Sequence, residues 1–400
     1  MNMNIRTFFG LMASMLLAVM TLSGCKHSDE PAPQRPATRT VLVYMVANNN
    51  LGYNDLDDLD IREMEAAVKA GGVPEGSHLV VYHAPYRKQP ELIEVTPLGN
   101  VTLKSYEGSI TSGASLTVDR MREVLADTET LAGADTYGLV FWSHGTGWVE
   151  SSTSRGQAPS ARSLTSADAA SMIQPMSFGD DNGYEMKITS IASALAGRRF
   201  DFIYFDCCLM GGVEVCYEMR GFTPVIVASP LELQTEGMPY DKNVPIFFEE
   251  KPDLVKAATN TYNHYVDVTY GISMVVVDTE ALDGLAAATR DIMATGVLPA
   301  DGYVPVKFWN SYRYAFVDMT HYITSLPGVS QSLLDAWRAA YDKAVIYKAA
   351  TPTCYGYDLT HFGGLACAYL SSPSDSGKWG YSNHAWWRDV MSRNPSLNAD

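Results

Sequence analysis

The chain has 400 residues, and 29 Lys or Arg against 45 Asp or Glu give it a formal net charge of −16. With 46% hydrophobic residues and ordinary numbers of Gly and Pro, it is not a disordered, collagen-like or coiled-coil protein. The acidic balance disfavours a protein that binds nucleic acid or anionic lipid through clustered basic side chains.

The N-terminus predicts a lipoprotein signal peptide over residues 1–24. Arg6 precedes the apolar run 8–20, and Leu22-Ser23-Gly24-Cys25 follows it. A basic start, a short apolar core and small residues before a cleavage site are typical of secretion, and the run is too short to span a bilayer. The sequence Leu22-Ser23-Gly24-Cys25 resembles the bacterial lipobox, in which the cysteine carries lipid. We therefore expect Cys25 to be lipidated; the alternative is a plain signal peptide with an incidental cysteine.

Residues 25–39 are polar and rich in proline, which predicts an extended tether. No later segment has 18 uninterrupted apolar residues, so we expect no second membrane segment. These features together predict a folded body at residues 40–400 that is held at the outer membrane or cell surface by lipid.

From Thr40 onward, short apolar runs alternate with segments of helical spacing. Strands are predicted at 41–46, 79–82, 92–95, 101–103, 137–142, 202–205, 225–228 and 272–277. Helices are predicted at 56–68, 116–131, 188–195, 213–220, 281–294 and 333–347. Continuous apolar strands separated by helices indicate parallel crossovers, so the fold class is a three-layer αβα sandwich. The stretch 149–187 is polar and rich in serine, and it predicts a long loop that is functional or disordered.

Two predicted strands run directly into residues with catalytic chemistry. The first is followed by Ser143-His144-Gly145, and the second by Asp206, Cys207 and Cys208 with glycines opening a helix. Ligands bind at the carboxyl ends of strands in such sheets, and a cysteine at a helix start next to a histidine can act as a nucleophile. A structural histidine and an inert buried cysteine are the alternatives.

The same residues resemble two signatures of the clostripain family of cysteine peptidases, relatives of caspases, gingipains and legumain. These are Ser143-His144-Gly145-x-Gly147-Trp148 and Asp206-x-Cys208-Leu209-Met210-Gly211. Residues 43–51 resemble the family's opening strand and turn, and residues 228–240 resemble the segment after a later strand. The resemblance implies a caspase-like, mostly parallel sheet at about residues 40–280, followed by a C-terminal extension at about 281–400 with further α/β elements.

The resemblance also implies roles for single residues. His144 matches the catalytic histidine and Cys208 the nucleophile, with the backbone N–H groups of Gly145 and Cys208 as the oxyanion hole. Asp206 and Glu236 match acidic residues of the pocket that binds a basic P1 side chain. Glu236 stands where the family more often has Asp, and Pro230 and Met238 also depart from the pattern, so strict Arg specificity does not follow.

The predicted function is that of a lipid-anchored, extracytoplasmic cysteine endopeptidase that uses a His–Cys dyad and cleaves after Arg or Lys. The resemblance also suggests self-cleavage after Arg155 or Arg162, in the long loop; the alternative is a loop that is merely solvated. We expect a peptide or protein substrate, no nucleic-acid partner and a monomer. No cofactor or metal site is predicted; some family members need calcium, but no site for it can be identified. The alternatives are a peptidase with another P1 preference and an inactive surface lipoprotein that binds peptide or glycan.

The remaining acidic and cysteine residues predict less. The acidic residues near the first helix lack the glycine and terminal glutamate of a calcium loop and are interpreted as a solvated helix start; they are Asp55, Asp57, Asp58 and Asp60. Cys207 is a departure from the family pattern, and Cys216 is expected in the core. Cys354 and Cys367 are either structural thiols or a disulfide.

Overall fold

The computed structural model describes residues 37–108, 110–150, 177–308 and 316–398, which belong to one compact unit. The predicted signal peptide, Cys25 and the tether up to residue 36 lie outside the described residues, as do Arg155 and Arg162. None of the helices in the described ranges combines the length and the apolar character needed to cross a membrane.

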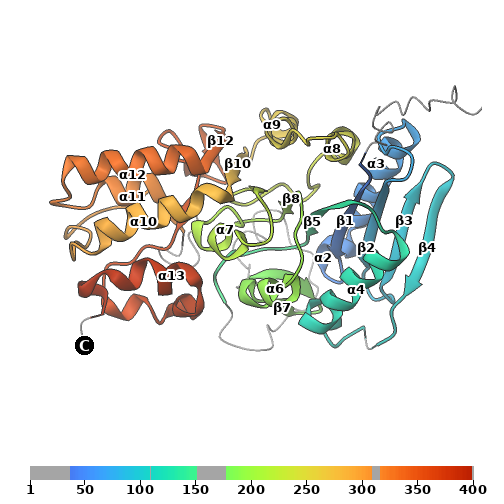
Figure 1. Cartoon of the computed structure of the whole chain (residues 1–400), viewed down its shortest axis with the longest axis horizontal. Helices are drawn as coiled ribbons and strands as arrows, with labels where there is room; N and C mark the ends of the chain where they lie inside the picture. Colours follow the sequence, from blue (N-terminus) through green and yellow to red (C-terminus); the bar gives the residue numbers. More distant parts are fainter. Residues whose placement is uncertain (1–36, 109, 151–176, 309–315, 399–400) are drawn as a thin grey trace, which may run out of the picture. The chain divides into compact units, whose positions relative to one another are not determined.

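A nine-stranded sheet forms the centre of the described unit, in the order β12-β10-β9-β8-β5-β1-β2-β3-β4 (Figure 1). Its strands are β1 Arg39–Val46, β2 His78–Ala84, β3 Glu91–Thr96, β4 Gly99–Ser105, β5 Thr136–Trp142, β8 Phe202–Asp206, β9 Val225–Ala228, β10 Ser273–Asp278 and β12 Val345–Ala350. The five central strands β9, β8, β5, β1 and β2 are parallel, and the strands at both edges pair antiparallel. The mostly parallel sheet is therefore confirmed.

Helices cover both faces of this sheet, because its central strands are apolar on both sides. Along β1, Leu42 and Tyr44 belong to one buried cluster, whereas Val41 and Val43 belong to the other. The first cluster includes residues of α4 Val118–Leu131, α6 Ile188–Leu195, α7 Val213–Met219, α10 Leu282–Met293 and α12 Gln331–Ala344. The second includes residues of α3 Leu56–Lys69, α8 Tyr240–Phe247 and α9 Leu254–Tyr265. The predicted three-layer αβα sandwich is confirmed.

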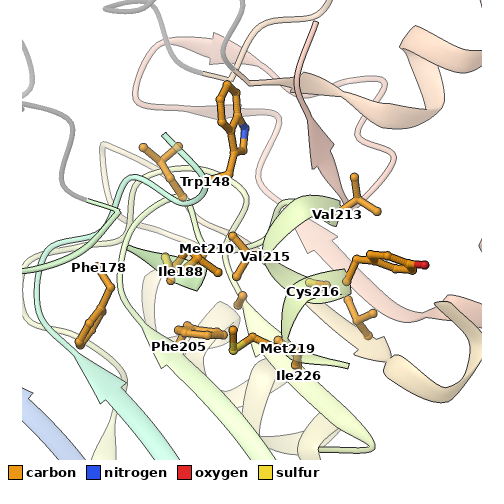
Figure 2. Close-up of a cluster of buried hydrophobic side chains, with 14 of the residues drawn as sticks. Trp148, Phe178, Ile188, Phe205, Met210, Val213, Val215, Cys216, Met219 and Ile226 are labelled. Atoms are coloured by element: carbon orange, nitrogen blue, oxygen red, sulfur yellow. The ribbon is translucent and has the colours of Figure 1, made fainter. Parts of the chain in front are cut away.

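The first cluster joins the central sheet to the C-terminal extension. Figure 2 shows Phe205 of β8 with Met210, Cys216 and Met219 around it, so the chain on both sides of Cys208 is anchored in this core. The extension adds α11 Met319–Thr324 and α13 Ala385–Asp389, together with the two-residue strands β11 Val317–Asp318, β13 Thr353–Cys354, β14 Tyr357–Asp358 and β15 Ala366–Cys367.

Two predictions of local structure are wrong. The helix expected over 333–347 ends at Ala344, and Val345–Ala350 forms β12, which pairs antiparallel with β10. The stretch 149–187 is not loop throughout its described part, because β6 Phe178–Asp181 and β7 Tyr184–Met186 form a hairpin there. One further short helix, α2 Asn50–Tyr53, follows β1 and lies beside the site described next.

Candidate active site

The sheet register brings His144 and Cys208 to the same edge. Trp142, at the end of β5, pairs with Asp206, at the end of β8, so each candidate residue lies two positions beyond a paired strand end. The two loops touch: a Cβ built on Gly145 would lie 2.6 Å from the carbonyl oxygen of Cys208. A side chain at position 145 would therefore force these loops apart.

His144 is oriented by a residue that the sequence reasoning missed. Its Nε2 lies 2.7 Å from Oδ1 of Asn50, the first residue of α2. An amide oxygen can only accept, so Nε2 carries the proton in this hydrogen bond and Nδ1 is the unprotonated ring nitrogen. Burial lowers the pKa of His144 to about 4, so the imidazole is neutral at pH 7.

Cys208 is partly buried under the chain that follows β9. The backbone N–H of Leu233 donates to Sγ of Cys208 at 3.3 Å, and Leu209 N donates to the carbonyl oxygen of Leu231 at 2.9 Å. Burial raises the pKa of Cys208 to about 12, so its sulfur is a thiol in this state. Leu209 has a φ of 61°, a left-handed conformation rarely adopted by a branched residue, and it makes a sharp turn directly after Cys208.

The neighbouring Cys207 points the other way. Its side chain is 2% exposed, belongs to the first buried cluster and donates from Sγ to the carbonyl oxygen of Phe141 at 3.2 Å. Burial raises the pKa of this thiol well above its usual value, as it raises that of Cys208, so the two thiols differ in exposure and in the direction they point. Cys216, Cys354 and Cys367 are buried and free, so Cys216 lies in the core as expected and the alternative of a Cys354–Cys367 disulfide is not realised.

The backbone N–H of Gly145 is turned away from the hairpin that flanks it. Gly145 and Phe178 form an isolated antiparallel bridge, and residues next to them make its two hydrogen bonds. Gly179 N donates to the His144 carbonyl oxygen, and Thr146 N donates to the Ser177 carbonyl oxygen. In an antiparallel bridge of this kind the N–H of the bridged residue points to the opposite side. The Gly145 N–H therefore takes part in neither hydrogen bond of this bridge.

Asp206 is 5% exposed and lies beside a second buried carboxyl that sequence reasoning assigned to solvent. Met238 N donates to both of its carboxylate oxygens, at 3.1 and 3.2 Å, and Tyr240 OH donates to Oδ2 at 3.1 Å. Asp60 of α3 is fully buried; its Oδ2 accepts from Trp142 Nε1 at 2.5 Å, and its Oδ1 has no partner among the described residues.

Both carboxyls lie against the side of Gly237 where another residue would carry its side chain. A Cβ on this residue would lie 2.8 Å from Asp206 Oδ2 and 3.0 Å from Asp60 Oδ2. Burial raises the pKa of both carboxyls, and the charge of Asp206 raises the pKa of Asp60 further, so Asp60 is protonated when Asp206 is ionised.

Glu236, directly before Gly237, is not buried with these two carboxyls. It is exposed, and its Oε2 accepts from the hydroxyl of Thr235 at 3.1 Å. The interpretation of the first helix as a solvated acidic start is wrong for Asp57 and Asp60, which are 3% and 0% exposed. A signal was present in the sequence, because Asp57, Asp60, Ile61 and Met64 fall on one helical stripe that is buried throughout.

One group in the described part of the chain has the donor spacing of a metal site. Single donor atoms of Asp57, Asp58 and His83 lie within 4.8 Å of one another, and His83 Nε2 is 2.7 Å from Asp57 Oδ2. Calcium takes six to eight oxygen ligands, so two carboxylates and an imidazole do not fit it. The pair instead joins α3 to β2 through a hydrogen bond between Asp57 and His83.

The chain is similar to known proteases in sequence and in structure. The profile of the clostripain family matches residues 43–351. The structure is similar to an inactive zymogen C11 protease from Parabacteroides distasonis, with 25% identity, a TM-score of 0.69 and coverage of 90% of this chain and 99% of that one. It is also similar to a secreted C11 cysteine protease from Bacteroides thetaiotaomicron in complex with an irreversible peptide inhibitor, with 27% identity, a TM-score of 0.69 and coverage of 88% and 98%.

A third solved structure is evidence for the fold only, because its sequence identity is low. It is a secreted C11 cysteine protease from Bacteroides thetaiotaomicron called iotapain, with 21% identity, a TM-score of 0.70 and coverage of 90% of this chain and 100% of that one. No curated protein sequence matches the chain significantly.

Proposed function

Because the chain belongs to the clostripain family and is a cysteine endopeptidase, we propose that Cys208 is its nucleophile and His144 its general acid and base. The observation that carries this assignment is the register of β5 and β8, which places both residues two positions beyond the paired residues Trp142 and Asp206. The burial of Cys207 and its hydrogen bond to the Phe141 carbonyl oxygen favour Cys208 over Cys207 in this role.

The geometry supports acyl transfer in two steps. Nδ1 of His144 takes the proton of the Cys208 thiol, and the sulfur attacks the carbonyl carbon of the scissile peptide bond. The N–H groups of Gly145 and Cys208 stabilise the negative charge on the carbonyl oxygen. The intermediate collapses to a thioester as the leaving amine takes the proton from His144. Water, deprotonated by His144, then hydrolyses the thioester, which releases the acid and restores the thiol.

Asn50 is a positioning residue in this mechanism. By accepting from Nε2, it holds the His144 ring in one tautomer and leaves Nδ1 free to receive the thiol proton. A carboxamide also leaves the imidazole uncharged in the resting state, in keeping with the low pKa of His144.

We further propose that the enzyme cleaves after Arg or Lys and that Asp206 supplies the acidic group of the P1 pocket. Asp206 ends the strand that leads to Cys208, and Asp60 Oδ2 lies against the same side of Gly237 as Asp206 Oδ2. A P1 cation would favour ionisation of both carboxyls, whereas an apolar P1 side chain would leave them without a counter-charge. Glu236, being exposed, contributes at the rim of this pocket.

The chain after β9 must move before a substrate reaches this pocket. Its Leu233 N–H is bonded to the sulfur of Cys208, and Met238 N–H and Tyr240 cover Asp206. We propose that self-cleavage after Arg155 or Arg162 accompanies this change, and that the enzyme is held by lipid on Cys25 outside the cytoplasm. Support for these points comes from the sequence and from relatives that include a zymogen and a secreted protease.

A positional-scanning library of fluorogenic peptides tests the catalytic assignment and the P1 preference together. We expect turnover with P1 Arg or Lys and none for Cys208→Ala. Turnover restricted to apolar P1 residues would contradict the acidic pocket, and full activity of Cys208→Ala would contradict the nucleophile. Intact mass of the wild type and of Cys208→Ala tests self-cleavage: two fragments are expected from the first and one intact chain from the second.

A further inference from the structure

Two buried glutamates occupy equivalent places after the two proposed catalytic residues. We call residues 144–150 the His144 arm and residues 208–214 the Cys208 arm. Glu150 lies six residues after His144, and Glu214 lies six residues after Cys208. They are 4% and 0% exposed, and Glu150 Oε1 and Glu214 Oε2 have no hydrogen-bond partner among the described residues. Glu150 Oε1 lies 4.0 Å from His384 Nε2, beyond hydrogen-bond distance. Burial of a carboxyl whose second oxygen makes no hydrogen bond costs stability, so packing alone does not explain either residue.

Glu150 is bonded to the C-terminal extension. Its Oε2 accepts from Asn383 Nδ2 at 3.2 Å and from Lys187 Nζ at 2.7 Å, and its backbone N–H donates to the Trp379 carbonyl at 3.0 Å. The backbone of the extension turns sharply here, because Trp379 and Gly380 both have positive φ, and a Cβ on Gly380 would overlap the Glu150 carboxyl.

Glu214 is bonded to the same part of the extension. Its Oε1 accepts from Tyr381 OH at 3.2 Å and from Ala368 N at 2.9 Å. Burial raises the pKa of this carboxyl to about 7. Next to it, Ala366 N donates to the Gly211 carbonyl at 3.0 Å, so β15 runs along the chain that leads from Cys208 into α7.

The ring of Tyr381 also connects the two arms. It packs edge-on against Trp148 with ring centroids 4.9 Å apart, and His384 Nε2 lies 3.0 Å from the Trp148 carbonyl oxygen. Figure 2 shows Trp148 from the His144 arm and Val213 from the Cys208 arm in one buried cluster. Residues 379–384, which we call the bracing segment, thus contact both arms.

We propose that the bracing segment positions the catalytic pair, by binding Glu150 and Glu214 together and so fixing the His144 loop relative to the Cys208 turn. This inference rests on the proposed dyad. It gives the C-terminal extension a role in catalysis without any contact with substrate: displacement of either arm by about 1 Å lowers the rate of a reaction that depends on alignment.

Tyr381→Phe is the first test, with Tyr322→Phe as its matched control. Both side chains are buried in the extension, but Tyr322 OH donates to the Leu370 carbonyl, at 2.9 Å, whereas Tyr381 OH donates to Glu214. We expect Tyr381→Phe to lower kcat about 10-fold with KM within twofold, and Tyr322→Phe to lower thermal stability while keeping kcat. Glu214→Gln retains the acceptor oxygen for Tyr381 and should keep kcat. Glu214→Leu removes this oxygen and should lower kcat.

The rate of Cys208 alkylation by iodoacetamide gives a second readout that needs no peptide substrate. It should fall in Tyr381→Phe and Glu214→Leu and stay unchanged in Tyr322→Phe. Equal effects of Tyr381→Phe and Tyr322→Phe on both kcat and alkylation, or no effect of Tyr381→Phe on either, would overturn the bracing role. If the wild type cleaves no peptide, the proposed function fails, and the alkylation rates alone decide whether the segment positions the pair.

Discussion

The side-chain oxygen of Asn50 lies 2.7 Å from Nε2 of His144, across 94 residues of sequence. This contact holds the imidazole by the nitrogen that does not take part in the proton transfer we propose, and it comes from a helix at the end of β1 rather than from the loop that carries the histidine.

Asn50→Ala should reduce kcat about 5- to 30-fold, which corresponds to the loss of ~1–2 kcal/mol from one orienting hydrogen bond. KM should change little, because Asn50 does not contact the proposed P1 pocket. Asn100→Ala is the control, because it also removes an amide that makes one side-chain hydrogen bond, to Glu65 at 2.9 Å. Asn100 is exposed and lies on the edge strand β4. An unchanged kcat in Asn50→Ala would show that the ring is held without this contact.

Three single substitutions separate the acidic residues of the proposed P1 pocket. Asp206→Asn should lower kcat/KM for P1 Arg about 10- to 100-fold, as expected for the loss of a buried charge-assisted contact. Glu236→Gln should lower it less than about fivefold, because an exposed ion pair contributes ~0–1 kcal/mol. Asp60→Asn should lower kcat/KM for P1 Arg by a factor between those of Asp206→Asn and Glu236→Gln. The measurement is kcat/KM for matched P1 Arg and P1 Ala peptides, and an effect of Glu236→Gln larger than that of Asp206→Asn would contradict this order.

Gly237→Ala should be less stable and should lose preference for basic P1 residues. The added methyl group would lie 2.8 Å from Asp206 Oδ2 and 3.0 Å from Asp60 Oδ2, and the φ of 69° strains any side chain. Gly328→Ala is the matched control, since its φ is 74° and no atom lies within 4 Å of the added carbon. Both variants should lose ~1 kcal/mol from the backbone conformation, while only Gly237→Ala should change the ratio of Arg to Ala cleavage. Equal specificity in the two variants would argue against the carboxyl pair as the pocket.

The uncleaved enzyme should react slowly with thiol reagents at neutral pH. With the pKa of Cys208 raised to about 12 and that of His144 lowered to about 4, both by burial, the pair is neutral between these values. Deprotonation of the thiol is then unfavourable below pH 12, and the thiolate fraction rises about 10-fold for each pH unit from 6 to 9.

Iodoacetamide labelling followed by peptide mass spectrometry measures this slope at Cys208, with Cys208→Ala to identify the peptide. A labelling rate that is already at its plateau at pH 6 would mean that the sulfur is paired as a thiolate with protonated His144 in this state.

Much of the central sheet was predictable because its strands carry a local pattern. The apolar runs in β1, β5 and β8 identify strands covered on both faces, and the polar residues after them identify the site. The boundary at Ala344 was not predictable from the pattern, because the residues after it can continue the helix, and only pairing with β10, about 70 residues earlier, makes them a strand.

The position of His144 and Cys208 beyond two neighbouring strand ends was predictable, and the side chains that contact this edge of the sheet were not. His144 and Cys208 follow strand ends and have a family signature, whereas Asn50 and Asp60 act through contacts across 94 and 82 residues with His144 and Trp142. Nothing near Asn50 marks it as other than a residue in a turn. Asp60 shares a stripe with Ile61 and Met64, so its burial, though not its partner, could have been inferred.

The braces on the two arms also set the order in which the enzyme matures. Glu150 is joined to Asn383 across 233 residues, and Glu214 is joined to Tyr381 across 167. A ribosome adds about 5–20 residues per second, so each glutamate leaves it many seconds before its partner. A chain that is exported N-terminus first likewise presents the central parallel strands before the extension, and its two arms stay unbraced until the extension follows. In the proposed bracing role, the chain therefore reaches its full rate of peptide-bond cleavage only after the extension has folded onto it.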